Sequence, residues 1–146
     1  MKWKPPLPWG EENKRLIKES VARILAEREE ILFAYLFGSF VHDPRFHDLD
    51  VGIYLREDAY AFPGPEGTFD LEMAVGLELE KNLGYPADVK VLNRASVALC
   101  HAVTNGTVLF SRDEGQRLNW VEKTWDHYLD MRYFLRSSLF DLLGVE

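Results

Sequence analysis

Cysteine is almost absent from this sequence, because Cys100 is the only one among 146 residues. A single cysteine excludes a disulfide framework and a metal site built from several cysteine ligands. Long apolar runs are missing too, since no stretch reaches the length of a membrane span. The opening MKWKPPLPWG also lacks the apolar segment of a secretory signal. We therefore expect a cytoplasmic protein with no membrane partner.

Basic residues are also fewer than acidic ones. The 17 Lys and Arg are outnumbered by 24 Asp and Glu, so the formal net charge is −7. Nonspecific binding of nucleic acid needs a basic face, and the composition therefore predicts no direct nucleic-acid binding. Core material is abundant instead: 47% of the residues are hydrophobic and 13% are aromatic, which is typical of a compact globule.

The spacing of apolar residues predicts the order of helices and strands. Prolines at positions 5, 6 and 8 indicate an extended arm over residues 1–10. We expect residues 11–146 to form a single domain. Within it the pattern predicts helices over 11–30, 69–83, 95–104 and 116–139, and strands over 31–37, 48–55, 87–92 and 107–110. This order predicts an α/β fold in which helices pack on a small mixed sheet.

The last predicted helix carries more aromatic residues than one apolar stripe can bury. They are Trp120, Trp125, Tyr128, Tyr133 and Phe134. Two interpretations remain open. The surplus forms a partner-binding face, or it covers the N-terminal arm.

Three aspartates stand at the heads of apolar strands. Asp48 and Asp50 are separated by one residue, so on a strand they project from the same face, with Cα atoms roughly 6.5–7 Å apart. Asp88 opens a later predicted strand. If the two strands are neighbours, the three carboxylates form a cluster at one end of the sheet. Hard oxygen ligands of this kind favour Mg²⁺ or Mn²⁺, and such a cluster suits two-metal phosphoryl transfer.

Glycine occurs at two positions near these acids. Gly38-Ser39 follows the first strand, where a glycine permits a tight turn and a serine hydroxyl can donate to a phosphate oxygen. Gly52 shares the face of Asp50, which we interpret as room for a ligand against the sheet.

The order of these residues resembles the minimal nucleotidyltransferase (MNT) family of the DNA polymerase β-like superfamily. Its pattern is a strand, Gly-Ser, a spacer, Asp-x-Asp on the next strand and a third Asp on a later strand. Gly38-Ser39, Asp48-Leu49-Asp50 and Asp88 match it. The stretch from Gly84 to Asp130 is also similar to the tail of MNT antitoxins. The resemblance covers residues 31–130.

The resemblance implies a polymerase β-like nucleotidyltransferase fold and Mg²⁺-dependent transfer of AMP from ATP, with two ions expected. In the antitoxin branch the acceptor is a tyrosine of a partner HEPN-domain RNase toxin, which the added AMP silences. Asp48, Asp50 and Asp88 would bind the metal, and Asp88 would also help to deprotonate the acceptor. Gly38 and Ser39 would hold the triphosphate.

The chain departs from the family pattern in the spacer FVHDPRFH. This spacer is shorter than usual, and His42-Asp43 occupies the place where Arg-Gly is common. Arg45, His47 and Lys90 are the candidates to supply the missing charge. Two other functions remain open. One is a small-molecule nucleotidyltransferase, which usually carries a further acceptor domain, and the other is a non-catalytic antitoxin that acts by binding alone.

Overall fold

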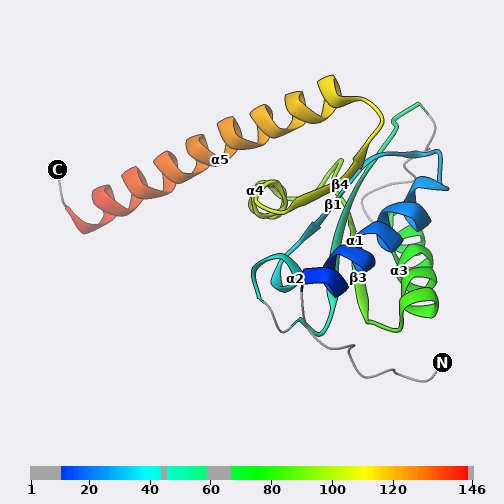
Figure 1. The fold of residues 1–146 in the computed structure, drawn as a ribbon. Coiled ribbons are helices and arrows are strands. Elements are labelled where there is room, and N and C mark those ends of the chain that lie inside the picture. Colours follow the sequence, from blue (N-terminus) through cyan, green and yellow to red (C-terminus); the bar gives the residue numbers. More distant parts are fainter. Residues whose placement is uncertain (1–10, 44–45, 59–66, 145–146) are drawn as a thin grey trace.

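The computed structural model describes residues 11–43, 46–58 and 67–144. Figure 1 shows a sheet with helices on both faces. Helices α1 (Glu11–Ala26) and α3 (Phe69–Leu83) cover one face, and α4 (Val97–Thr104) and the first half of α5 (Glu114–Leu143) cover the other. The strands are β1 (Ile31–Phe37), β2 (Leu49–Leu55), β3 (Ala87–Val91) and β4 (Thr107–Ser111), and a short helix, α2 (Ser39–His42), follows β1.

The helix ends show why these segments fold as the sequence predicts. Gly84 ends α3 in the left-handed region, with φ 78°, a conformation that glycine adopts without steric cost. Ser96 accepts a hydrogen bond from the Leu99 amide at the start of α4, and Asp113 accepts one from Gln116 at the start of α5. Such side-chain caps satisfy amide groups that have no partner inside the helix. The predicted arm, residues 1–10, lies outside the described residues.

The sheet is mixed, as predicted, with strand order β3-β2-β1-β4. Strand β1 runs antiparallel to β2 and β4, whereas β2 and β3 run parallel. The last residue of β1 therefore lies at the same end of the sheet as the first residues of the other three strands. We call this the Gly38 end, because Gly38 directly follows β1. In the register, Phe37 pairs with Asp50, and Asp50 pairs with Asp88.

Apolar residues fill both sides of the sheet. On the side of α1 and α3, the core includes Val21, Leu25 and Leu79, which are fully buried. On the other side, Phe33 and Tyr35 pack against Trp120 of α5, with ring centroids 5.3 and 5.7 Å apart. The two cores therefore support the sheet from both faces.

The free edge of β3 is protected by two glutamates of α3. Glu80 accepts a hydrogen bond from the Ala87 amide at 3.0 Å, and Glu72 accepts one from the Val91 amide at 2.8 Å. Amide groups on an edge strand otherwise invite pairing with another chain. The same two bonds fix β3 on both sides of Asp88.

Helix α5 continues far past the sheet (Figure 1). In its first half it packs on α4, where the ring of Tyr128 stacks on His101 with centroids 3.5 Å apart. From residue 132 to residue 143 every position except Ser137 is exposed. Across the described ranges, none of the helices combines the length and the apolar character that a bilayer crossing requires.

Candidate active site

Asp50 and Asp88 lie side by side at the Gly38 end of the sheet. They are register partners on the parallel strands β2 and β3, which confirms that the two strands are neighbours. Asp48 is exposed and lies in a bend one residue before β2. The strand therefore begins at Leu49, one residue later than predicted. Asp50 is partly buried, whereas Asp88 is exposed.

The environment of Asp50 disfavours its negative charge. Burial raises the pKa of the Asp50 carboxyl above its ordinary value, and the neighbouring charges of Asp48 and Asp88 raise it further. Lys90 acts in the opposite direction. Asp50 is therefore close enough to Asp48 and to Asp88 to interact electrostatically with each, and Lys90 only partly compensates their effect on it.

Three basic residues were candidates to supply the charge that the spacer lacks. The structure places one of them, Lys90, beside the acids. Its Nζ lies 3.6 Å from Oδ1 of Asp88, and both side chains are exposed. His47 is exposed, and Arg45 lies outside the described residues. Lys90 thus partly offsets the charge of the aspartates in the protein alone.

Gly38 lies directly against Asp50. A Cβ atom at Gly38 would stand 2.4 Å from Oδ2 of Asp50, which is too close for any real contact. The backbone of Gly38 has φ 74° and ψ −145°, a combination that residues other than glycine rarely adopt. Both features require glycine at this position. With glycine there, the turn lies directly against the carboxylate of Asp50.

Ser39 connects the turn to the second acid. Its Oγ donates a hydrogen bond to Oδ1 of Asp48 at 3.3 Å. Ser39 also begins α2, and the Asp43 amide donates back to its carbonyl at 2.7 Å. The structure therefore gathers all five predicted residues, Gly38, Ser39, Asp48, Asp50 and Asp88, at one end of the sheet.

The interpretation of Gly52 was wrong. A Cβ atom at this position would stand 3.1 Å from Cδ2 of Leu92 and 3.2 Å from Cγ1 of Val103. The space above Gly52 is occupied by side chains of the protein itself, so the glycine serves the packing of α4 on the sheet.

An aromatic cluster beneath the site was not predicted from the sequence. Phe40 and Phe46 meet edge to face at 4.6 Å, and Phe46 lies 5.2 Å from Tyr85. The three rings come from the segments that lead away from Ser39, into Asp48 and into Asp88. These residues show no helical or strand periodicity relative to one another, so only the folded chain reveals their contact.

The donor set at the Gly38 end fits a divalent cation. The carboxylates of Asp48, Asp50 and Asp88 are hard oxygen ligands with a surplus of negative charge that such an ion would offset. In the described ranges, however, no three acidic, histidine or cysteine side chains already converge on one point as a metal site. Binding of an ion would therefore draw these exposed or partly exposed carboxylates together.

The arrangement agrees with the one that the sequence resemblance implies, and a comparison with known families tests that resemblance. The sequence profile of the family described as polymerase beta, nucleotidyltransferase matches residues 19–115. The chain belongs to this family, and the predicted superfamily is confirmed. Among curated proteins, no sequence is similar enough to count as a match.

Solved structures with the same fold include several toxin–antitoxin complexes. An MNT antitoxin in complex with a tri-AMPylated HEPN toxin of Shewanella oneidensis has a TM-score of 0.66 at 18% identity, covering 89% of this chain and 98% of that chain. A toxin–antitoxin structure with AMP-PNP has a TM-score of 0.63 at 20% identity, with coverages of 92% and 99%. The MntA–HepT complex has a TM-score of 0.65 at 18% identity, with coverages of 88% and 98%. At these identities the likeness establishes the polymerase β-like fold.

Proposed function

We propose that the protein is an antitoxin that transfers AMP from ATP to a hydroxyl, expected to be a tyrosine, of a HEPN-domain RNase toxin. The observation that carries this proposal is the pairing of Asp50 with Asp88 beside the Gly38-Ser39 turn. Support comes from the structural likeness to an MNT antitoxin bound to a tri-AMPylated HEPN toxin. We place the reaction in the cytoplasm, where ATP and Mg²⁺ are both available.

In this proposal each site residue has its own role. Asp48, Asp50 and Asp88 hold Mg²⁺, with two ions expected, and bound Mg²⁺ supplies neutralisation of phosphate charge. Gly38 and Ser39 hold the triphosphate. Asp88 accepts the proton of the acceptor hydroxyl. The acceptor oxygen then bonds to the α-phosphorus of ATP as the bond to the β-phosphate oxygen breaks, and pyrophosphate leaves.

The test is transfer of radiolabel into the toxin copurified with this protein. With Mg²⁺, label from α-³²P-ATP is expected on the toxin, whereas label from γ-³²P-ATP is expected only in pyrophosphate. An Asp50→Asn variant is expected to label nothing. Toxin that is silenced equally well by wild type and by this variant, with no label on either, would mean that binding alone neutralises it. Label on a small molecule and not on the protein would favour the alternative of a small-molecule nucleotidyltransferase.

The projecting half of α5 is the surface that we expect to bind the toxin. Tyr133 and Phe134 are 75% and 67% exposed, and Leu135, Leu139 and Leu142 are exposed as well. Exposed aromatic and aliphatic clusters of this kind mark protein interfaces. Replacing Tyr133 and Phe134 with serine is expected to raise the Kd for the toxin by at least about 30-fold, since one interface hot spot contributes roughly 2 kcal/mol.

Calorimetric titration of the purified toxin measures this change. The melting temperature of the isolated double variant should match that of wild type, because both side chains are mostly exposed. Leu77→Ser is the matched control, since Leu77 is 53% exposed on α3 and its loss removes apolar surface elsewhere. Equal weakening by the control and the double variant would contradict the assignment of the interface to α5.

A further inference from the structure

A lysine of α1 reaches the segment that joins Ser39 to Asp48. The Nζ of Lys14 donates hydrogen bonds to the carbonyl oxygens of Phe40, at 2.5 Å, and of Asp43, at 2.8 Å. These carbonyls lie within and just after α2, where the last carbonyls of a helix have no partner inside it. A lysine is well suited to satisfy them, because it also complements the negative end of the helix.

The same ammonium group also contacts the other end of the segment. It lies 5.4 Å from the centre of the Phe40 ring and 5.8 Å from the centre of the Phe46 ring, distances at which a cation is attracted to an aromatic face. Phe46 is 1% exposed and stands two residues before Asp48. One side chain therefore holds the segment just after Ser39 and just before Asp48.

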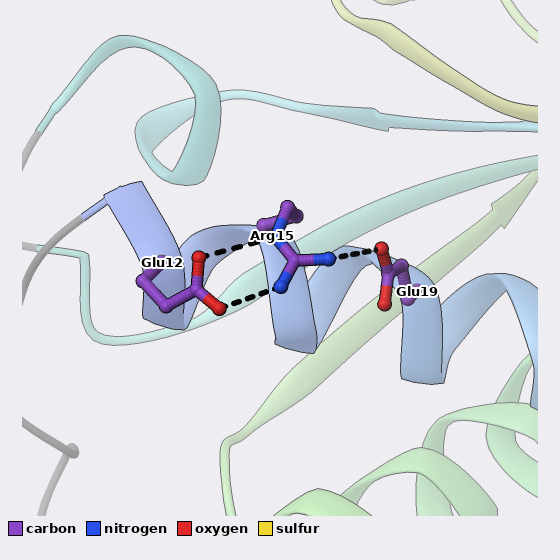
Figure 2. Close-up of polar contacts among 3 residues, drawn as sticks. All are labelled: Glu12, Arg15 and Glu19. Atoms are coloured by element: carbon purple, nitrogen blue, oxygen red, sulfur yellow. Dashed lines mark hydrogen bonds and ion pairs between the residues drawn. The ribbon is translucent and has the colours of Figure 1, made fainter.

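The other basic residues of this part of α1 do not make this connection. Arg15 is bound within its own helix, to Glu12 at 2.5 Å and to Glu19 at 2.8 Å (Figure 2). Lys18 lines the same cavity of about 470 Å³ as Lys14. Within the described chain, however, Lys18 donates no hydrogen bond to α2. This difference makes Lys14 the specific anchor and Lys18 a matched control.

We propose that Lys14 is a positioning residue for the nucleotide site. By fixing both ends of the short spacer, it holds Ser39 and Asp48 in the arrangement that receives the triphosphate and the metal ion. It acts through these residues and touches no reacting atom. The proposal rests on the proposed function, since it concerns the same site.

The first experiment measures order in the spacer without any need for catalysis. Amide hydrogen exchange is followed over residues 38–43, where the amides of Val41 and His42 bond to Gly38 and that of Asp43 bonds to Ser39. Lys14→Met is expected to speed this exchange by about tenfold, because it keeps the length of the side chain and removes its donors. Lys14→Arg should restore slow exchange, and Lys18→Met should leave it unchanged. Exchange over α3 should stay constant in all variants.

The second experiment links this order to function through binding of AMP-PNP with Mg²⁺, measured by calorimetry at a temperature where every variant is folded. Lys14→Met is expected to raise the Kd about tenfold, with recovery in Lys14→Arg and no change in Lys18→Met. Equal exchange in Lys14→Met and wild type would overturn the proposal, and so would faster exchange with unchanged affinity. Wild type that binds AMP-PNP but modifies no toxin would refute the proposed function alone.

Discussion

Replacing Asp50 with asparagine is expected to lower AMP transfer by about 10³-fold or more. Asp50 is a proposed ligand of the catalytic Mg²⁺, and such a ligand contributes several kcal/mol to stabilisation of the transition state. The same change should make the metal-free protein more stable. Asp50 is partly buried between Asp48 and Asp88, and burial and both charges raise the pKa of its carboxyl. Asparagine keeps the shape and removes the repulsion. The expected rise in Tm is about 3 °C, the shift that roughly 1 kcal/mol produces in a domain of this size.

Thermal unfolding with EDTA and with Mg²⁺ measures both parts of this expectation. Because a ligand that binds only the folded state stabilises it, Mg²⁺ should raise the Tm of wild type more than that of Asp50→Asn. With EDTA the variant should have the higher Tm, and with Mg²⁺ the wild type should have the higher Tm. Asp126→Asn is the control, since Asp126 is exposed on α5 and its loss changes the net charge equally. A variant that is less stable without metal, with an unchanged Mg²⁺ shift, would show that Asp50 does not bind the ion.

This opposition between stability and activity explains a feature of the sequence that packing alone would not favour. Carboxylates placed beside one another cost folding free energy when no cation lies between them. The rest of the fold offsets that cost locally. Lys90 pairs with Asp88, and Glu72 and Glu80 secure the edge strand that carries it. The strand that carries Asp88 is therefore held in place by contacts with α3 that lie outside the charged cluster.

The sequence was a good guide where a feature depends on local chemistry. The spacing of apolar residues predicted both β2 and α3, and the structure has these elements over Leu49–Leu55 and Phe69–Leu83. Local patterns could not predict that Asp50 and Asp88 lie side by side, because the pairing of parallel strands depends on contacts between residues distant in the sequence. The family resemblance supplied that prediction, and the register confirms it.

What the sequence could not reveal arises from residues far apart along the chain. Lys14 precedes the carbonyl that it binds by 26 residues, and Phe46 and Tyr85 come from separate segments. No periodicity relates them. The error at Gly52 has the same origin, because a pattern shows that space is needed but not which atoms fill it. Here they belong to Leu92 and Val103.

Replacing Gly38 with alanine is expected to reduce AMP transfer by about 10²-fold or more, since a displacement of about 1 Å at a catalytic group has an effect of that size. The added Cβ would meet Oδ2 of Asp50 at 2.4 Å, and φ 74° with ψ −145° is unfavourable for alanine. The carboxylate or the turn must move. We also expect a loss of about 1–3 kcal/mol of stability from the strained backbone. Initial rates of label transfer and chemical denaturation measure the two effects.

Gly144→Ala separates backbone strain from the clash with Asp50. Gly144 also has a positive φ, 69°, but a Cβ there meets no atom of the described chain within 4 Å. The control should therefore lose stability from strain while its transfer rate stays normal. In an Asp50→Ala background, Gly38→Ala should cost less stability than in wild type, because the clashing oxygen is gone. Additive losses in that double variant would mean that the Gly38 turn does not press on the carboxylate, and that glycine is required there by its dihedral angles alone.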